Sequence, residues 1–246
     1  MIELDNVSLA PSVAQCTGLA ARPTQVLQAY DEARKAEALT ACEAAAQAAP
    51  GNSNVQYLLG DVYSLNGDLS AAVKSYERAA DLGDAKGFAR IGSLYYFGTG
   101  VGRDLQQAVN WFRRAAEKGD AGSMTYLGYA YRNGEGVARD YKEAMKWFRR
   151  AADKGDAAAM TNIGNAYHNA EGVERNYQEA MKWFRLAADK GDAGAMRNIG
   201  ICYENGDGVA RDIEQARRWY LQAEATSPGI AKQDLANLEA ASPGRS

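Results

Sequence analysis

The chain has 246 residues, of which 46% are hydrophobic and 24% are charged, and its mean hydropathy is −0.44. No apolar run approaches the roughly 18 residues that a bilayer-spanning helix needs, so we expect no membrane insertion. The net charge of −3 and the isoelectric point of about 5.4 disfavour a dedicated nucleic-acid binder, whose surface is usually basic.

Residues 1–23 are predicted to form an extended N-terminal segment, because Pro11 and Pro23 interrupt it. Glu3 and Asp5 lie where a signal peptide carries positive charge, so the segment is not an intact signal. The start of a mature secreted chain remains an alternative interpretation.

Residues 24–84 are rich in helix-forming residues and are predicted to contain two short helix-pair units. The first unit resembles the second helix of a tetratricopeptide repeat at Ala38, Cys42, Ala45 and Pro50. The second unit resembles a complete tetratricopeptide repeat at Gly60, Tyr63, Ala72, Tyr76 and Ala79.

From residue 85 onward the sequence repeats itself four times with a period of 36 residues. The period is fixed by a glycine series and a tryptophan series, namely Gly92, Gly128, Gly164 and Gly200, and Trp111, Trp147, Trp183 and Trp219. Self-similarity at such a period is typical of a solenoid, in which each unit buries its apolar face against its neighbours.

One repeat is predicted to be a pair of helices, at about residues 121–132 and 141–153, separated by a glycine-rich loop. Asp140 and Glu143 have the spacing of a capping box for the second helix. Gly128 lies inside the first helix, where glycine costs about 1 kcal/mol relative to alanine. Its recurrence predicts a close approach by a bulky ring of the second helix.

Two departures from the repeat pattern are relevant to the third repeat. Ala170 occupies a position that is glycine in the sister repeats, which predicts a different loop closure. Asn176 replaces the aspartate that precedes the second helix.

The repeat pattern resembles that of the Sel1-like repeat family over about residues 85–225. The resemblance is carried in one copy by Met124, Leu127, Gly128, Tyr131, Gly134, Gly136, Val137, Asp140, Ala144, Trp147, Phe148, Ala151 and Gly155. It implies an all-α fold, a right-handed α-solenoid of antiparallel helix pairs. We expect four repeats over residues 85–226, a C-terminal capping helix over 227–241 and a tail over 242–246.

Motifs for catalysis are weak in this sequence, and we predict a non-enzyme without a cofactor or a metal site. The glycine run at residues 98–102 has the composition of a phosphate loop, but it recurs as a helix–helix turn with Glu135 between glycines. His168 is the only histidine, so no histidine pair for zinc exists.

The three cysteines permit two interpretations. They are either small buried hydrophobic residues or include a Cys16–Cys42 disulfide that ties the N-terminal segment down. A disulfide would imply an oxidising compartment, and we slightly favour the bacterial periplasm or cell envelope over the cytoplasm.

The first helices of the repeats are expected to line the concave face of the solenoid, as in the related tetratricopeptide architecture. Some side chains there vary between repeats while the core positions do not, and aromatic, arginine and amide groups suit a protein-binding surface. The alternative is an unconstrained surface. The predicted partner-binding residues are Tyr57, Asp61, Ser93, Tyr96, Phe97, Thr125, Tyr129, Arg132, Asn133, Asn165, His168, Asn169, Arg197 and Glu204.

These features favour a non-catalytic module that binds a partner protein or peptide in its groove, as a bacterial adaptor or scaffold. An immunity protein that neutralises a secreted toxin is a more specific alternative. A cell-envelope hydrolase and a purely structural envelope component are further alternatives. We expect the unbound chain to be a monomer.

Overall fold

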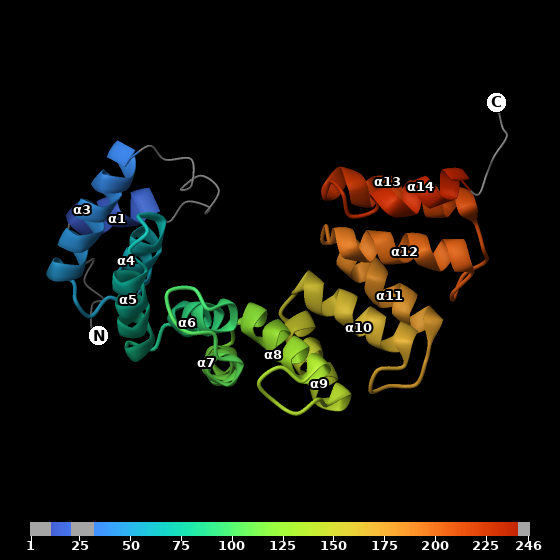
Figure 1. Ribbon diagram of the computed structural model, residues 1–246, viewed down its shortest axis with the longest axis horizontal. Coiled ribbons are helices and arrows are strands. Elements are labelled where there is room, and N and C mark those ends of the chain that lie inside the picture. Colours follow the sequence, from blue (N-terminus) through green and yellow to red (C-terminus); the bar gives the residue numbers. More distant parts are fainter. Residues whose placement is uncertain (1–10, 21–31, 241–246) are drawn as a thin grey trace, which may run out of the picture. The chain divides into compact units, whose positions relative to one another are not determined.

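The computed structural model describes residues 11–20 and 32–240, and every regular element in these residues is an α-helix (Figure 1). The chain divides into two compact units, Met1–Asp120 and Ala121–Ser246. In both units the helices follow one another as antiparallel pairs, which confirms the predicted all-α solenoid architecture. Among the helices of these residues, none combines the length and the hydrophobicity that crossing a bilayer requires.

In unit 1, each helix packs against the next helix along the chain, and α1 also packs against α4. The helices of this unit are α1 (Pro11–Ala20), α3 (Glu32–Ala48), α4 (Ser53–Leu65), α5 (Leu69–Asp81), α6 (Ala85–Phe97) and α7 (Leu105–Glu117).

In unit 2, three helix pairs are followed by one capping helix, and α8 also contacts α10. The helices are α8 (Ala121–Asn133), α9 (Tyr141–Asp153), α10 (Ala157–Asn169), α11 (Tyr177–Ala188), α12 (Ala193–Asn205), α13 (Ile213–Thr226) and α14 (Lys232–Ala240). The capping helix begins at Lys232, a few residues later than expected, and buries Leu238.

The glycines inside the first helices allow the two helices of a pair to pack closely. A Cβ at Gly128 would lie 2.3 Å from Cε1 of Phe148, which is far inside van der Waals contact. This confirms that the glycine makes space for a ring of the second helix. The tryptophan series is less uniform than predicted, because Trp147 is buried at 8% exposure while Trp111, Trp183 and Trp219 are half-buried.

The second helices begin at a side-chain cap, but the capping box is only half formed. Oδ1 of Asp140 accepts hydrogen bonds from the backbone N–H groups of Lys142 and Glu143. The backbone N–H of Asp140 instead donates to the carbonyl of Tyr131 on the preceding helix. The Glu143 carboxylate is 2.7 Å from Lys146 Nζ, so the predicted return contact from Glu143 is wrong.

Ala170 does not change the loop, contrary to the sequence-based expectation. Its φ of 63° is left-handed, like the φ of 84° at Gly206 in the next repeat. The N–H groups of Ala170 and Glu171 both donate to the carbonyl of Ala166, and Gly206 and Asp207 bond to Cys202 in the same way. The loop geometry is therefore set by these hydrogen bonds, and alanine bears the backbone strain.

The N-terminal segment is helical at residues 11–20, so the prediction of an extended segment is wrong there; the rest of residues 1–23 lies outside the described residues. Val13, Cys16 and Ala20 form the buried face of α1. Cys16 is disulfide-bonded to Cys42 of α3, which confirms the disulfide alternative. The proline that suggested an extended chain opens the helix, a position where its missing N–H costs nothing.

Candidate functional site

The predicted partner-binding side chains lie on the first helices of the pairs, and the structure divides them into two groups. We call the exposed and half-buried side chains of α8, α10 and α12 the A-helix surface of unit 2. Many predicted residues there are already engaged in contacts between successive repeats. The remaining residues are open or line a pocket.

Thr125 and its counterpart Thr161 belong to the buried contacts between repeats. Thr125 is only 5% exposed and its hydroxyl donates to Oδ1 of Asp156, at 3.1 Å. The same Asp156 oxygen accepts the Ala159 N–H and so caps α10. Thr161 and Asp192 repeat the arrangement at 3.0 Å. The prediction that Thr125 is exposed is therefore wrong, because the next helix cap covers it.

A second set of contacts joins the middle of each first helix to the next one. The amide of Asn162 donates to the hydroxyl of Tyr129 at 2.8 Å, and the amide of Asn198 donates to Oδ1 of Asn165 at 2.9 Å. Both pairs are separated by 33 residues. The two repeats therefore use an equivalent asparagine to hold two different partners.

In unit 1 the corresponding contact is ionic. Asp61 of α4 accepts a hydrogen bond from Arg90 Nη2 of α6 at 2.9 Å. It also accepts the hydroxyl of Tyr76 at 2.8 Å. Burial, followed by the charge of Asp61, raises the pKa of Tyr76 far above its ordinary value, so this phenol stays protonated. Asp61 is thus already paired within the solenoid.

A third set of contacts reaches from the end of a first helix to the loop of the next repeat. Arg132 Nε pairs with Oε2 of Glu171 at 2.9 Å. His168 stands at the equivalent position one repeat later, and its Nε2 lies 3.0 Å from Oδ2 of Asp207. Each contact closes the space between neighbouring repeats at the loop end of the helices.

The last two predicted residues on α12 are held by the C-terminal part of unit 2. Arg197 makes a bidentate ion pair with Asp234 of the capping helix α14, with distances of 2.6 and 2.9 Å. Glu204 accepts the hydroxyl of Tyr220 at 2.6 Å. Both are half-buried, so they fasten the end of the solenoid rather than offer a free group.

Three predicted residues remain on open surface. Phe97 of α6 is 63% exposed, and the half-buried ring of Tyr96 meets it edge to face at 4.9 Å between centroids. Asn133 and Asn169 are exposed at equivalent positions at the ends of α8 and α10. These side chains are the predicted residues that a partner can reach with the least rearrangement.

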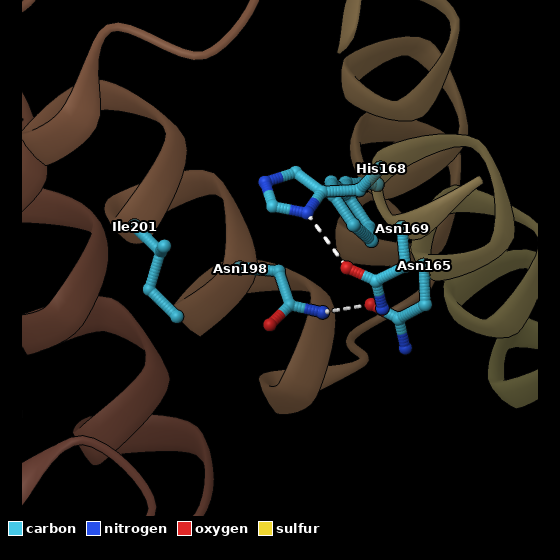
Figure 2. A pocket seen from close by; sticks show the side chains of 6 residues that line it. Asn165, His168, Asn169, Asn198 and Ile201 are labelled. Atoms are coloured by element: carbon cyan, nitrogen blue, oxygen red, sulfur yellow. Dashed lines mark hydrogen bonds between the residues drawn. The ribbon is translucent and has the colours of Figure 1, made fainter. Parts of the chain in front are cut away.

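One pocket on the A-helix surface of unit 2 brings three predicted residues together. It has a volume of about 200 Å³ and lies between α10 and α12. Figure 2 shows Asn165, His168 and Asn169 on one side, facing Asn198 and Ile201 on the other. The Asn198–Asn165 hydrogen bond spans the pocket, and Nδ1 of His168 lies 3.0 Å from Oδ1 of Asn169.

Unit 1 carries a second pocket of about 320 Å³ between α4 and α6. The predicted residues Tyr57 and Ser93 line it, together with Lys86, Arg90 and Asp120. Lys86 Nζ lies over the Tyr57 ring, at 5.6 Å from its centroid. Desolvation by burial, followed by the Asp61 charge, raises the pKa of Tyr57.

Part of this site was predictable from the sequence and part was missed. The structure brings the predicted residues Asn165, His168 and Asn169 together at one pocket, and their role in partner binding stays a prediction. Asn198 and Phe184 were missed in unit 2, as were Lys86 and Arg90 in unit 1. The recurrence of Asn162 as Asn198, a polar residue inside a helix at the same repeat position, is the signal that could have found Asn198.

The pocket of unit 2 suits recognition by hydrogen bonding and packing. Neutral amides, an imidazole and the apolar side chain of Ile201 can accommodate a peptide or a side chain without strong charge preference. In residues 11–20 and 32–240, no group of three or more histidine, cysteine or acidic side chains is arranged to hold a metal ion.

These features define the molecule as a helical repeat protein with variable side chains presented by its first helices. The sequence comparison identifies the family. The model of the Sel1 repeat matches residues 89–120, 121–156, 157–192 and 193–225, which is more than half of the chain. The chain belongs to the Sel1 repeat family, and residues 53–82 match the tetratricopeptide repeat. Among curated proteins, no sequence matches.

Several solved structures resemble this one. A Sel1 repeat protein from Oxalobacter formigenes is 29% identical, with a TM-score of 0.73, and the match covers 85% of this chain and 90% of that protein. The protective antigen c5321 of uropathogenic Escherichia coli is also 29% identical, with a TM-score of 0.73 and 91% of this chain covered. The match spans 49% of c5321.

The immunity protein Pa5087 of Pseudomonas aeruginosa shares the fold, with a TM-score of 0.56 and 20% identity over 96% of this chain and 89% of that protein. Sel1 and tetratricopeptide repeats generally mediate protein–protein interaction and are generally non-catalytic scaffolds.

Proposed function

We propose that this chain is a non-catalytic interaction module that binds a partner protein or peptide on the A-helix surface of unit 2. The pocket of about 200 Å³ between α10 and α12 carries the proposal. It lies on the face where the side chains differ most between repeats, and its walls offer amide and imidazole groups beside an apolar residue. Such a mixture provides both orientation and contact area to a protein ligand.

The test must separate partner contact from the contacts that hold the repeats together. Exchange of Tyr129, Arg132 or His168 would break inter-repeat contacts, so a loss of binding would be ambiguous. Asn133 and Asn169 are exposed, and their hydrogen bonds stay within their own repeats, to Glu135 and His168. The informative variant is therefore Asn133→Arg/Asn169→Arg.

The matched control is Gln178→Arg, which places the same side chain at an exposed position on the second helix α11. Each protein is used to capture partners from its native host, with quantitative mass spectrometry and circular dichroism to verify folding. We expect a partner that the wild type and Gln178→Arg retain and that the double variant loses by at least tenfold. Equal capture by all three proteins would contradict the proposed surface.

A second candidate function is the neutralisation of a secreted bacterial toxin. It is supported by the fold shared with the immunity protein Pa5087 over nearly the whole chain. The captured partner would then arrest growth when expressed alone, and co-expression of the wild type would restore growth. A partner that is harmless on its own would contradict this role and favour an adaptor.

We also propose that the protein works in an oxidising compartment, such as the bacterial periplasm. The Cys16–Cys42 disulfide supports this, because disulfides persist where thiols are not kept reduced. Rapid acid quenching of cells, followed by alkylation with a mass label, measures the state of the two thiols. Free thiols at both positions in the native host would contradict the proposal.

A further inference from the structure

Asn165, Phe184 and Asn198 line the pocket of about 200 Å³ between α10 and α12. Their equivalents 36 residues earlier are Tyr129, Phe148 and Asn162. A neighbouring space in that repeat, lined by Arg132, Phe148 and Asn162 together with further residues of α9, measures only about 10 Å³. The two sets of equivalent positions therefore differ in one side chain, a tyrosine in one repeat and an asparagine in the next.

The position that differs has a much larger side chain in the earlier repeat. Tyr129 stands where the next repeat has Asn165. The Tyr129 ring meets Phe148 edge to face, with 5.6 Å between the centroids, and its hydroxyl accepts the Asn162 amide at 2.8 Å. Burial is the main cause of a raised pKa at Tyr129, which keeps this phenol neutral. A tyrosine side chain of unit 2 thus occupies the place between Phe148 and Asn162.

In the following repeat the groups that would receive such a ring are all present. Phe184, at 1% exposure, forms the floor as Phe148 does, and Ile201 adds an apolar wall. Asn198 is equivalent to Asn162, and its Nδ2 donates to Oδ1 of Asn165 in the absence of a phenol. A cavity of about 150 Å³ with apolar walls is known to hold a benzene ring, so about 200 Å³ is sufficient for a phenol.

We propose that this pocket receives a tyrosine side chain of the partner, in the place that Tyr129 occupies one repeat earlier. The inference rests on the proposed function and names the kind of side chain that the proposed site binds. The guest ring packs on Ile201 with its edge toward Phe184. The guest hydroxyl replaces the Asn165 oxygen as the acceptor of the Asn198 amide, and the Asn165 side chain turns outward.

The probe for this pocket is p-cresol, which is the side chain of tyrosine as a free molecule. Side-chain amide signals of Asn165 and Asn198 are followed by NMR while p-cresol is added to the full chain. We expect saturable shifts at these two amides, with a dissociation constant on the order of 1 mM for so small a ligand. Toluene, which lacks the hydroxyl, should bind about two- to tenfold more weakly.

Two reciprocal variants and one control make the test specific. Asn165→Tyr fills the pocket with the chain's own ring and should abolish p-cresol binding. Tyr129→Asn opens the preceding space and should add a second p-cresol site, detected at Asn162. Gln178→Tyr introduces a tyrosine at an exposed position of the second helix α11 and should leave binding unchanged. If Tyr129→Asn does not fold, the comparison of p-cresol binding by the wild type and by Asn165→Tyr still tests the proposal.

The outcomes separate this inference from the proposed function. Absence of p-cresol shifts in the wild type, or undiminished binding by Asn165→Tyr, would overturn the pocket assignment. Equal affinities for toluene and p-cresol would overturn the choice of tyrosine. Because none of these measurements needs a partner, the capture experiment with Asn133→Arg/Asn169→Arg can still succeed when the tyrosine inference fails. If Asn165→Tyr also fails to capture the partner, the same pocket supports both proposals.

Discussion

The N-terminal helices of unit 1 and the repeats of unit 2 are fastened by different means. Helices α1, α3 and α4 share a cluster of small apolar side chains, and a disulfide joins α1 to α3. Helices α8, α10 and α12 are joined by hydrogen bonds that recur with the repeat, such as Thr125–Asp156 and Thr161–Asp192. A chain of helix pairs can therefore be secured by one covalent link or by many periodic polar contacts.

The largest expected effect is a difference in unfolding free energy between variants at two equivalent tryptophans of unit 2. Trp147→Ala removes a side chain that is 8% exposed and should cost about 3–5 kcal/mol of unfolding free energy. Trp183→Ala, at a half-buried site, should cost clearly less. Urea unfolding followed by circular dichroism measures both. Because contacts in a solenoid are between neighbours, Trp147→Ala should split unfolding into two transitions, and a single unchanged transition would contradict this account.

The disulfide is expected to act only on its own end of the chain. Cys16→Ala/Cys42→Ala removes a link that closes 26 residues of sequence separation and should cost unit 1 about 3 kcal/mol. Hydrogen exchange of the backbone amides reports each helix separately. Protection should fall in α1 and α3 and remain unchanged in α8–α13. An equal loss of protection across unit 2 would show that the two ends are not independently stabilised.

The buried thiol of unit 2 should make its stability depend on alkaline pH. Burial, followed by the Asp207 charge, raises the pKa of Cys202 to about 12 from an ordinary value of 9.0. The native state thus holds the thiol proton more tightly than the unfolded state. This contribution is complete below pH 9 and is lost as the pH rises through about 12.

Urea unfolding of the wild type and of Cys202→Ala, at several pH values from 7 upward, tests this dependence. The difference in stability between the two proteins should shrink with rising pH. A constant difference would mean that the thiol titrates normally.

The smallest effect concerns the strained loop of the third repeat. Ala170 has a φ of 63°, which costs an alanine about 1–2 kcal/mol. Ala170→Gly relieves this strain but adds freedom to the unfolded chain, so we expect a net gain of about 0.5–1 kcal/mol. Ala138→Gly, in the sister loop and without a positive φ, should be neutral or destabilising. Thermal unfolding compares the two, and equal shifts would argue against strain at Ala170.

The sequence predicted the helices and their pairing because both follow from the spacing of apolar residues. It also predicted the close approach at Gly128, because a glycine inside a helix needs a steric reason. It did not predict the burial of Thr125. The repeat period shows which side of a helix faces away from the other helix of its pair, but it does not show how near the next repeat lies. The same limit applies to Arg132 and His168, whose partners are 39 residues distant in sequence.

Errors at the ends and loops had local causes. Pro11 was interpreted as a break, although proline is also favourable in the first turn of a helix. Ala170 was expected to alter its loop, but the surrounding hydrogen bonds outweigh the preference of one residue. In both cases the surrounding structure, which the sequence pattern does not show, decided the backbone conformation.

The Asn162–Tyr129 and Asn198–Asn165 contacts are each separated by 33 residues, which has a consequence for how such a chain can evolve. A tandem duplication of residues 157–192 would create one new boundary, at which the copied Asn162 faces Asn165. Asn198, the equivalent of Asn162, already bonds to Asn165, so this contact would need no compensating substitution. Each duplication would also copy Asn165, His168 and Asn169, so that binding valency could grow in steps of one repeat before any new contact is selected.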